Sequence, residues 1–286
     1  MQGSFKQVCK SFLVGKKTKL FLPIAILLGI FQLSQAQTIE TLKRIENDSV
    51  YIDFINPYLA PIEIKLSSLD STKTFIKGNS YGVLKHMDTL KNALILPVNR
   101  VKDTSKINLK RFIQFKANFG DPNSKIDRTY EYSLPFPRGK RYKIIQSFGG
   151  NFSHNKPHSK YAIDIGTQIG DTITAIRPGT VFFVKEDSTE HCRTPKCVDK
   201  GNKVLILHDD GSIANYVHLD FDGALVAVGD RVEDSEPIAI SGMTGFTTIP
   251  HLHLVIHQSR GISIPFKFKG QNTKKLKKGR FYKRKH

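Results

Sequence analysis

The run His251-Leu252-His253-Leu254-Val255-Ile256-His257 begins with imidazole and leucine side chains in strict alternation. Because successive side chains of a β-strand point to opposite faces, His251 and His253 are predicted to share one face and the two leucines the other. The alternation therefore predicts a strand with an apolar side for the core and two imidazoles on its other side. Two histidines at this spacing are a weak sign of a metal site by themselves, so the rest of the chain decides their meaning.

The whole region from residue 141 to residue 265 favours strands over helices. Short apolar runs alternate with Gly- and Asp-rich turns, and no segment has a convincing helical period. The strand candidates are 172–175, 179–185, 203–208, 213–219, 237–241 and 251–257. The segment before this region, Leu134 to Gly139, holds two prolines and is predicted to be a linker, because proline stops ladder pairing. Residues 141–265 are thus expected to form a mainly β domain.

Residues 37–135 are predicted to form a separate accessory domain. Val50 to Ile55 and Ile62 to Leu66 alternate with period two, and the turn formers Asn56-Pro57 stand between them. Short strands at this spacing are typical of a small β-sandwich. This region gathers no catalytic residues, and its single histidine, His86, is interpreted as a surface residue.

Residues 1–36 have the pattern of a secretory signal peptide. Five lysines and no acidic residue precede the apolar run Phe21 to Leu33, which ends at Ser34-Gln35-Ala36, a cleavage pattern of small residues. The apolar run is short for a membrane span, so an uncleaved anchor is the alternative interpretation. Both interpretations place the rest of the chain outside the cytoplasm, as a periplasmic, envelope-associated or extracellular protein.

The chain is strongly basic, with a formal net charge of +19. Removal of residues 1–36 would take away five lysines, so most of this charge belongs to the mature protein. Residues 266–286 are dense in Lys and Arg and contain no acidic residue, which predicts a basic disordered tail. The tail is either solvated without a partner or held electrostatically at an anionic wall or membrane surface, whereas export argues against nucleic acid as a partner.

Two cysteines, Cys192 and Cys197, remain after the signal segment. An even pair in an oxidising compartment suggests a disulfide. Because so short a loop adds little global stability, the bond is expected to pin a surface excursion.

A carboxylate and several imidazoles stand in apolar surroundings. Asp164 lies in Tyr161-Ala162-Ile163-Asp164-Ile165-Gly166, where an unpaired charge would be costly. His154 precedes it by ten residues, and His218 lies in Tyr216-Val217-His218-Leu219. With the histidine pair of residues 251–253, this inventory fits catalytic zinc, which takes three protein ligands and leaves a fourth position open.

These segments, in this order, resemble the sequence blocks of lysostaphin-type zinc metallopeptidases. The resemblance covers about residues 144–257 and includes Ser241-Gly242-Met243-Thr244-Gly245 and Pro250-His251-Leu252-His253. It implies an antiparallel β-sheet peptidase domain of the duplicated hybrid motif type, with zinc at the base of an open groove. The fold class expected for the chain is therefore mainly β, a small β-sandwich followed by this peptidase domain.

Carried over residue by residue, the resemblance implies that His154, Asp164 and His253 bind Zn²⁺, and that His218 and His251 are the catalytic pair. The metal would polarise the scissile carbonyl and lower the pKa of a bound water. One imidazole would accept the proton of that water while the other steadies the developing oxyanion.

The first ligand is ambiguous, because the commonest form of the family places His four residues before Asp. Here the spacing is ten residues from His154 and six from His158. His154 is favoured, since Phe152-Ser153-His154 followed by a polar excursion looks like a long-loop variant, whereas His158 follows a proline inside that excursion. His191, His208 and His257 are interpreted as structural or exposed.

The sequence thus predicts a secreted zinc-dependent endopeptidase that hydrolyses peptide cross-links of bacterial peptidoglycan through a zinc-bound water, with the stem peptides as its substrate. The alternative is a non-catalytic, wall-binding activator of other peptidoglycan hydrolases, since some members of the family have lost zinc ligands. A protease that acts on secreted proteins is a third hypothesis. The presence of all five site residues favours the enzyme.

Overall fold

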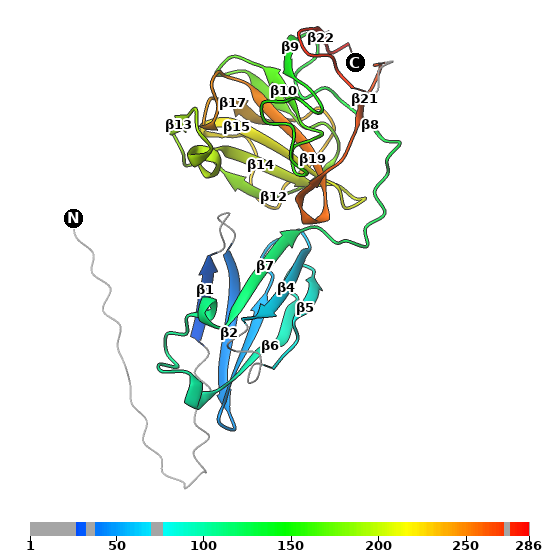
Figure 1. Cartoon of the computed structure of the whole chain (residues 1–286). Helices are drawn as coiled ribbons and strands as arrows, with labels where there is room; N and C mark the ends of the chain where they lie inside the picture. The colour runs from blue at the N-terminus through cyan, green and yellow to red at the C-terminus, as the bar shows by residue number, and fades with distance from the viewer. Residues whose placement is uncertain (1–26, 33–37, 70–76, 272–274, 286) are drawn as a thin grey trace, which may run out of the picture.

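The computed structural model describes residues 27–32, 38–69, 77–271 and 275–285 (Figure 1). Most of the predicted signal peptide, residues 1–26 and 33–36, lies outside the described residues, while β1 (Leu27–Gln32) runs beside β2 (Thr38–Glu46). The signal peptide stays a prediction. Within the described ranges, none of the helices has the length and hydrophobicity needed to span a membrane.

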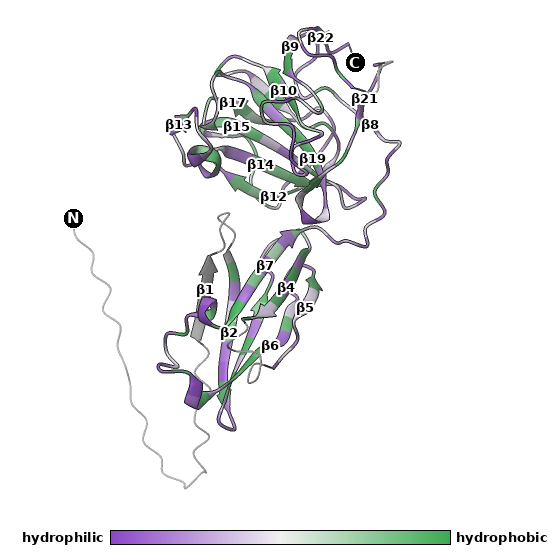
Figure 2. Ribbon diagram, in the orientation of Figure 1, coloured by the Kyte–Doolittle hydropathy of each residue, from purple (hydrophilic) through white to green (hydrophobic). Residues whose placement is uncertain are grey.

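The N-terminal domain is the predicted β-sandwich. One sheet has the order β1-β2-β3-β6 and the other the order β5-β4-β7. The remaining strands are β3 (Ser49–Ile55), β4 (Ile62–Ser68), β5 (Tyr81–Leu84), β6 (Thr89–Pro97) and β7 (Ile113–Phe119). Their inward residues, such as Phe54 and Ile64, form one apolar core, and Figure 2 shows hydrophobic and hydrophilic residues alternating along these strands. The period-two pattern is the reason for this architecture.

The C-terminal domain is built on a large sheet with the order β16-β12-β14-β15-β19-β10-β9-β22, to which β11, β17 and β20 are attached. Two further pairs, β13 with β18 and β8 with β21, are parallel. The strands are β8 (Glu131–Tyr132), β9 (Arg141–Gln146), β10 (Ile163–Gly166), β11 (Thr172–Thr174), β12 (Gly179–Lys185), β13 (His191–Cys192), β14 (Asn202–Leu207), β15 (Ile213–Ala224), β16 (Arg231–Val232), β17 (Pro237–Ser241), β18 (Gly245–Phe246), β19 (Leu252–Gln258), β20 (Ile262–Ser263), β21 (Lys267–Phe268) and β22 (Phe281–Lys283). In the described residues of both domains, the helices are short 3₁₀ turns: Val98–Arg100 and Leu109–Arg111 in the N-terminal domain, Pro195–Lys200 and Ser259–Gly261 in the C-terminal domain. The mainly β prediction is confirmed.

Strand β19, which carries His253 and begins directly after His251, lies in the middle of this sheet. Its His253 is opposite Asp164 of β10 on one side and opposite Val217 of β15 on the other. Leu252 and Leu254 are buried in the core, as the alternation predicted. The sheet therefore brings residues that are about 90 positions apart in the chain next to one another.

The predicted linker, residues 134–139, is part of the second core and not a free connection. Leu134 and Phe136 are buried among the side chains of the C-terminal domain, together with Tyr132. The prolines do prevent continued pairing, but the large apolar residues between them are buried. The connection that leaves the N-terminal core runs instead between β7 and β8 (Figure 1).

The prediction of a disordered tail is wrong for the described part of residues 266–286. Strand β22 pairs with β9, β21 pairs with β8, and Phe266, Phe268 and Leu276 are buried in the same core. Arg284 is also buried, and it donates hydrogen bonds to the carbonyl oxygens of Leu134 and Phe136. The average composition of the tail does not reveal this order, because the buried apolar residues are few and most of the cations between them are exposed.

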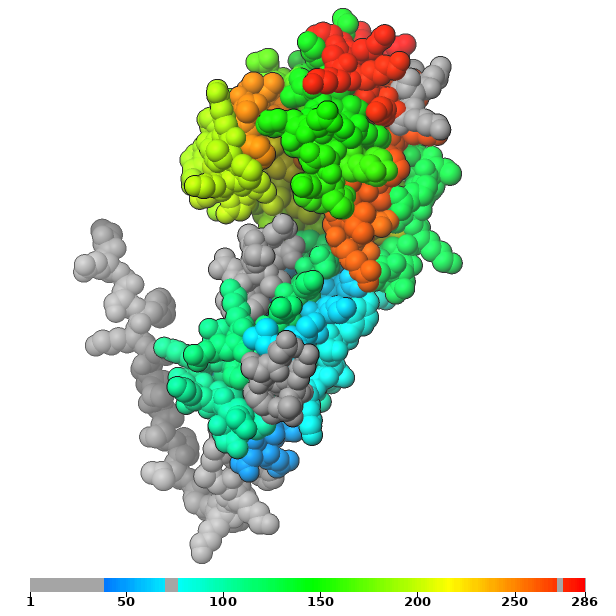
Figure 3. All heavy atoms as spheres, viewed as in Figure 1, coloured from blue at the N-terminus to red at the C-terminus, as the bar shows by residue number. Residues whose placement is uncertain are grey.

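The two domains touch through a bidentate ion pair and an apolar contact. Arg260, just after β19, donates from Nε and Nη2 to the two carboxylate oxygens of Glu63 on β4, at 2.7 and 2.5 Å. Phe119 of β7 packs edge-on against Phe182 of β12. Figure 3 shows the chain around Arg260, in orange, resting on the cyan part of the N-terminal domain.

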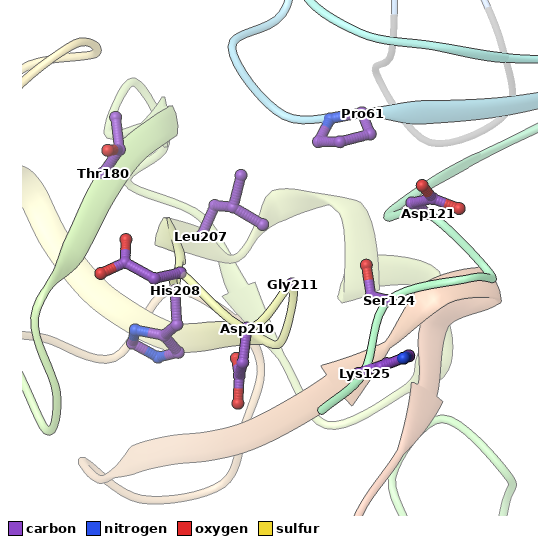
Figure 4. A pocket seen from close by; sticks show the side chains of 10 residues that line it. Pro61, Asp121, Ser124, Lys125, Thr180, Leu207, His208, Asp210 and Gly211 are labelled. Atoms are coloured by element: carbon purple, nitrogen blue, oxygen red, sulfur yellow. The ribbon is translucent and has the colours of Figure 1, made fainter. Parts of the chain in front are cut away.

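A hollow of about 430 Å³ lies between the domains (Figure 4). Pro61 and Ser124 line it, opposite Leu207 and Asp210. Asp210 is engaged by Arg177 at 2.7 Å, so this carboxylate is already neutralised. His208 also lines the hollow, whereas none of the five predicted site residues does.

Cys192 and Cys197 form the predicted disulfide, with their Cα atoms 5.8 Å apart. The bond closes an excursion between β12 and β14 that includes β13, and both cysteines are partly exposed. The expectation of a pinned surface loop is thus confirmed.

Candidate metal centre

The three predicted metal ligands converge on one point. His154 comes from the loop between β9 and β10, Asp164 from β10 and His253 from β19. Oδ1 of Asp164 lies 3.1 Å from Nε2 of His154 and 2.8 Å from Nδ1 of His253. All three ligand atoms lie within 4.8 Å of one another.

The polarity of these atoms fits a cation. Nδ1 of His154 lies 3.0 Å from the carbonyl oxygen of Ser147, to which it can only donate. A neutral His154 therefore points the lone pair of Nε2 at a carboxylate oxygen, and two acceptors face each other in a buried place. A metal ion between them removes this repulsion, and two imidazole nitrogens with one carboxylate are a donor set of catalytic zinc.

Asp164 is charged in this setting. Burial acts to raise the pKa of Asp164, but the imidazoles of His154 and His253 beside its carboxylate outweigh burial and hold that pKa well below its ordinary value. The carboxylate is consequently available as an anionic ligand throughout the physiological pH range.

Gln146 holds the second oxygen of Asp164, and sequence reasoning missed it. Nε2 of Gln146 donates to Oδ2 of Asp164 at 3.0 Å and to Oγ of Ser153 at 2.7 Å. The two residues are opposite each other in the pairing of β9 with β10. No local pattern marks this glutamine, since only strand pairing brings it to the carboxylate.

We expect Gln146→Ala to bind zinc about 10- to 100-fold more weakly, because a carboxylate ligand that loses its outer hydrogen bond is less well oriented. Competition with a chelator of known affinity measures this. Lys143→Ala is the control, since it changes an exposed residue of the same strand. An unchanged zinc affinity in Gln146→Ala would contradict the role given to this amide.

The predicted catalytic pair lies beside the ligands. The rings of His218 and His251 are 4.6 Å apart, and Nε2 of His251 lies 3.8 Å from Oδ1 of Asp164. Nδ1 of His218 donates to the carbonyl oxygen of Thr244 at 2.6 Å, and Nδ1 of His251 lies 2.8 Å from that of Ile249. Each imidazole therefore keeps Nε2 as its free acceptor.

Both imidazoles are neutral at pH 7. Burial, followed by the charges of His251 and His253, lowers the pKa of His218 to about 3. Burial also lowers the pKa of His251. Two neutral imidazoles next to a metal-ligand set can accept a proton, which is the property that a general base needs.

His218 has an unusual backbone, with φ at 67°. Its neighbours Val217 and Leu219 pair with Lys203 and Asn202, which are consecutive on β14, so His218 is the extra residue of a β-bulge. A bulge re-aims a side chain, and a left-handed non-glycine residue needs surroundings that hold it in place. The sequence predicted a straight strand here.

The structure separates His158 from the ligand cluster. Its side chain is exposed, and its carbonyl oxygen lies 2.7 Å from Nε2 of His257. His208 is buried and bonds to Pro178 through Nδ1, while His191 is exposed on β13. Of the two candidates for the first ligand, the geometry brings only His154 to Asp164.

Residues 158–265 match the family described as Peptidase family M23. This part of the chain belongs to peptidase family M23. The predicted membership of the lysostaphin-type metallopeptidases is thereby confirmed at the level of the family. The matched range contains Asp164, His218, His251 and His253, whereas His154 lies four residues before it.

Two of the proteins to which the chain is similar are named as endopeptidases. The chain is 30% identical over 203 residues to an uncharacterized metalloprotease of Buchnera aphidicola subsp. Baizongia pistaciae, covering 67% of this chain and 48% of that protein. It is 33% identical over 94 residues to the glycyl-glycine endopeptidase ALE-1 of Staphylococcus capitis, covering 32% and 23%. It is 29% identical over 126 residues to the peptidoglycan DD-endopeptidase ShyB of Vibrio cholerae, covering 42% and 26%. The chain thus spans about half the length of the first relative and about a quarter of the others.

Proposed function

We propose that the protein is an exported, zinc-dependent endopeptidase that hydrolyses peptide cross-links of peptidoglycan. The observation that carries the proposal is the placement of two neutral imidazoles, His218 and His251, beside the donor atoms of His154, Asp164 and His253. The names of two relatives, a glycyl-glycine endopeptidase and a peptidoglycan DD-endopeptidase, support the substrate class.

His154, Asp164 and His253 would hold the zinc, with Gln146 fixing the carboxylate. Bound zinc supplies Lewis acidity, which polarises a carbonyl and lowers the pKa of water. The remaining chemistry belongs to the pair: Nε2 of His218 or His251 accepts the proton of the attacking water. Once protonated, the same nitrogen becomes a donor that can stabilise the oxyanion or protonate the leaving amine.

Digestion of purified peptidoglycan tests the proposal. We expect soluble muropeptides with new amino termini, identified by mass, and no such products after chelation and removal of zinc. Products released equally with and without metal would exclude this mechanism. Stimulation of a second hydrolase by a protein that releases nothing itself would favour the wall-binding activator, and cleavage of Gly-rich proteins but not of sacculi would favour the protease of secreted proteins.

The basic face of β9 and β22 supports an anionic wall polymer as a partner. Arg141 and Lys143 of β9 are exposed beside Lys283 of β22, and the guanidinium of Arg141 lies 4.7 Å from the centre of the Phe281 ring. Residues 132–163 and 266–286 contain no acidic residue, and these two segments meet at this edge of the sheet. Because β9 continues to Gln146, the positive face adjoins the metal centre.

Since the described part of the tail is ordered and Leu276 is buried, the tail's charges are tested by substitution and not by truncation. We expect Lys277→Gln, Lys278→Gln, Lys283→Gln and Lys285→Gln together to weaken sedimentation with purified sacculi at low salt. The difference should vanish near 1 M salt, where the Debye length is about 3 Å. Turnover of a soluble muropeptide should be unchanged. Equal binding of the variant and the parent across the salt series would contradict an electrostatic role.

A further inference from the structure

The segment from Thr244 to Ile249 holds both catalytic imidazoles. The carbonyl oxygen of Thr244 accepts from Nδ1 of His218, and the carbonyl oxygen of Ile249 accepts from Nδ1 of His251. Oγ1 of Thr247 lies 3.2 Å from the same nitrogen of His251 and also donates to the Ile249 carbonyl. The tautomer and orientation of both rings thus depend on where this segment lies.

The disulfide loop, residues 188–201, holds this segment in turn. Strand β13 of the loop pairs with β18 of the segment, so the Gly245 amide donates to the carbonyl of Glu190 at 2.8 Å and the Thr247 amide to that of Cys192 at 3.2 Å. Cys192 is bonded to Cys197 within the same loop. The disulfide therefore lies one hydrogen bond away from the segment.

The loop and the segment are packed so closely that no Cβ fits between them. A Cβ at Gly245 would lie 2.6 Å from Cα of Gly201 and 3.3 Å from the carbonyl oxygen of Cys197. Gly245 also has φ at 85°, which other residues rarely adopt. A shift of the loop must consequently move the segment.

Asn202, the residue after the loop, provides a second link. Asn202 is fully buried, and its backbone N–H donates to Oγ1 of Thr244 at 2.9 Å. Its side-chain oxygen accepts from the backbone N–H of Ser188, and its side-chain nitrogen donates to the carbonyl oxygens of Ser188 and Asp220. Oγ1 of Thr244 donates onward to the carbonyl of Leu219, next to the bulged His218. Loop, segment and bulge are therefore one hydrogen-bonded unit.

We propose that the Cys192–Cys197 loop, acting through Asn202 and Thr244, is a positioning element of the catalytic pair, which makes hydrolysis depend on the disulfide. The inference rests on the proposed function. The three metal ligands lie on β10, β19 and the loop before β10, outside this unit. Reduction should therefore disturb catalysis and spare the metal.

A trialkylphosphine reduces the bond in the test. The phosphine attacks one sulfur and, with water, becomes the phosphine oxide, while two electrons and two protons convert the disulfide to two thiols. We expect kcat on a purified cross-linked muropeptide dimer to fall about 10- to 100-fold in the reduced protein and in Cys192→Ser with Cys197→Ser, because displacement of about 1 Å has this cost. KM and zinc content should stay within twofold. An unchanged kcat, or a loss of zinc that accounts for the effect, would overturn the proposal.

Threonine 244 separates positioning from general stability. Thr244→Val loses the hydrogen bonds to Asn202 and Leu219 and should lower kcat, whereas Thr244→Ser keeps the hydroxyl and should keep kcat near that of the parent. Imidazole ¹H–¹⁵N correlation spectra give a readout that needs no hydrolysis: the Nδ1–H signal of His218 should be sharp in the oxidised protein and lost or broadened on reduction. If the oxidised protein cleaves no muropeptide, the proposed function fails, yet these spectra still decide the positioning role. If reduction left the His218 signal unchanged, the positioning role would be refuted.

Discussion

The Asp164→Ala variant is expected to lose its zinc and all measurable hydrolysis. Its carboxylate is the only anionic ligand in the candidate centre, and it contacts both His154 and His253. Without it, two imidazoles remain, which are too few protein ligands to hold catalytic zinc. Metal analysis after dialysis and muropeptide release measure the two losses, and His154→Ala and His253→Ala should behave in the same way.

His158→Ala is the matched control for His154→Ala. The exposed His158 lies outside the ligand cluster, so its removal should leave zinc content and hydrolysis unchanged. If His158→Ala emptied the site while His154→Ala remained loaded, the assignment of the first ligand would be wrong.

His218→Ala and His251→Ala are each expected to keep their zinc and to lose rate. A general base or an oxyanion donor contributes about 10² to 10⁴-fold. Both imidazoles are uncharged and keep Nε2 free, so this nitrogen can accept a proton. Single-turnover kinetics with a muropeptide dimer, together with metal analysis, separate the two effects.

Two controls make that result interpretable. His208→Ala removes a buried imidazole outside the ligand cluster, so it reports the cost of losing a core histidine. The thermal midpoint of each variant shows whether the fold survives. A metal-free His251→Ala protein would place His251 among the ligands and refute the division of roles.

The sequence predicts the parts of this site that depend on local order. Strict alternation over residues 251–254 decides which side of the chain carries the two imidazoles where β19 begins, and a single Asp among apolar residues marks β10. Both features follow from the period of a strand, and they do not depend on the rest of the fold. The N-terminal β-sandwich was predictable for the same reason.

Features that depend on pairing between distant strands were not predictable. Gln146 reaches Asp164 only because β9 lies beside β10, and the bulge at His218 exists only in relation to β14. The tail was misjudged because average charge conceals single anchors such as Leu276. The contribution of each residue to these features is set by its partners across the sheet.

The burial of Leu134 and Phe136 with Phe266, Phe268 and Leu276 means that the range recognised by similarity is smaller than the folding unit. A fragment cut at residues 141 and 265 would remove these side chains from both ends of the core. Each large apolar side chain contributes about 1.5–3 kcal/mol when buried, so their joint loss rivals the whole stability of a typical domain. Anyone who excises the catalytic part for expression must therefore begin before Glu131 and keep the chain through Arg284.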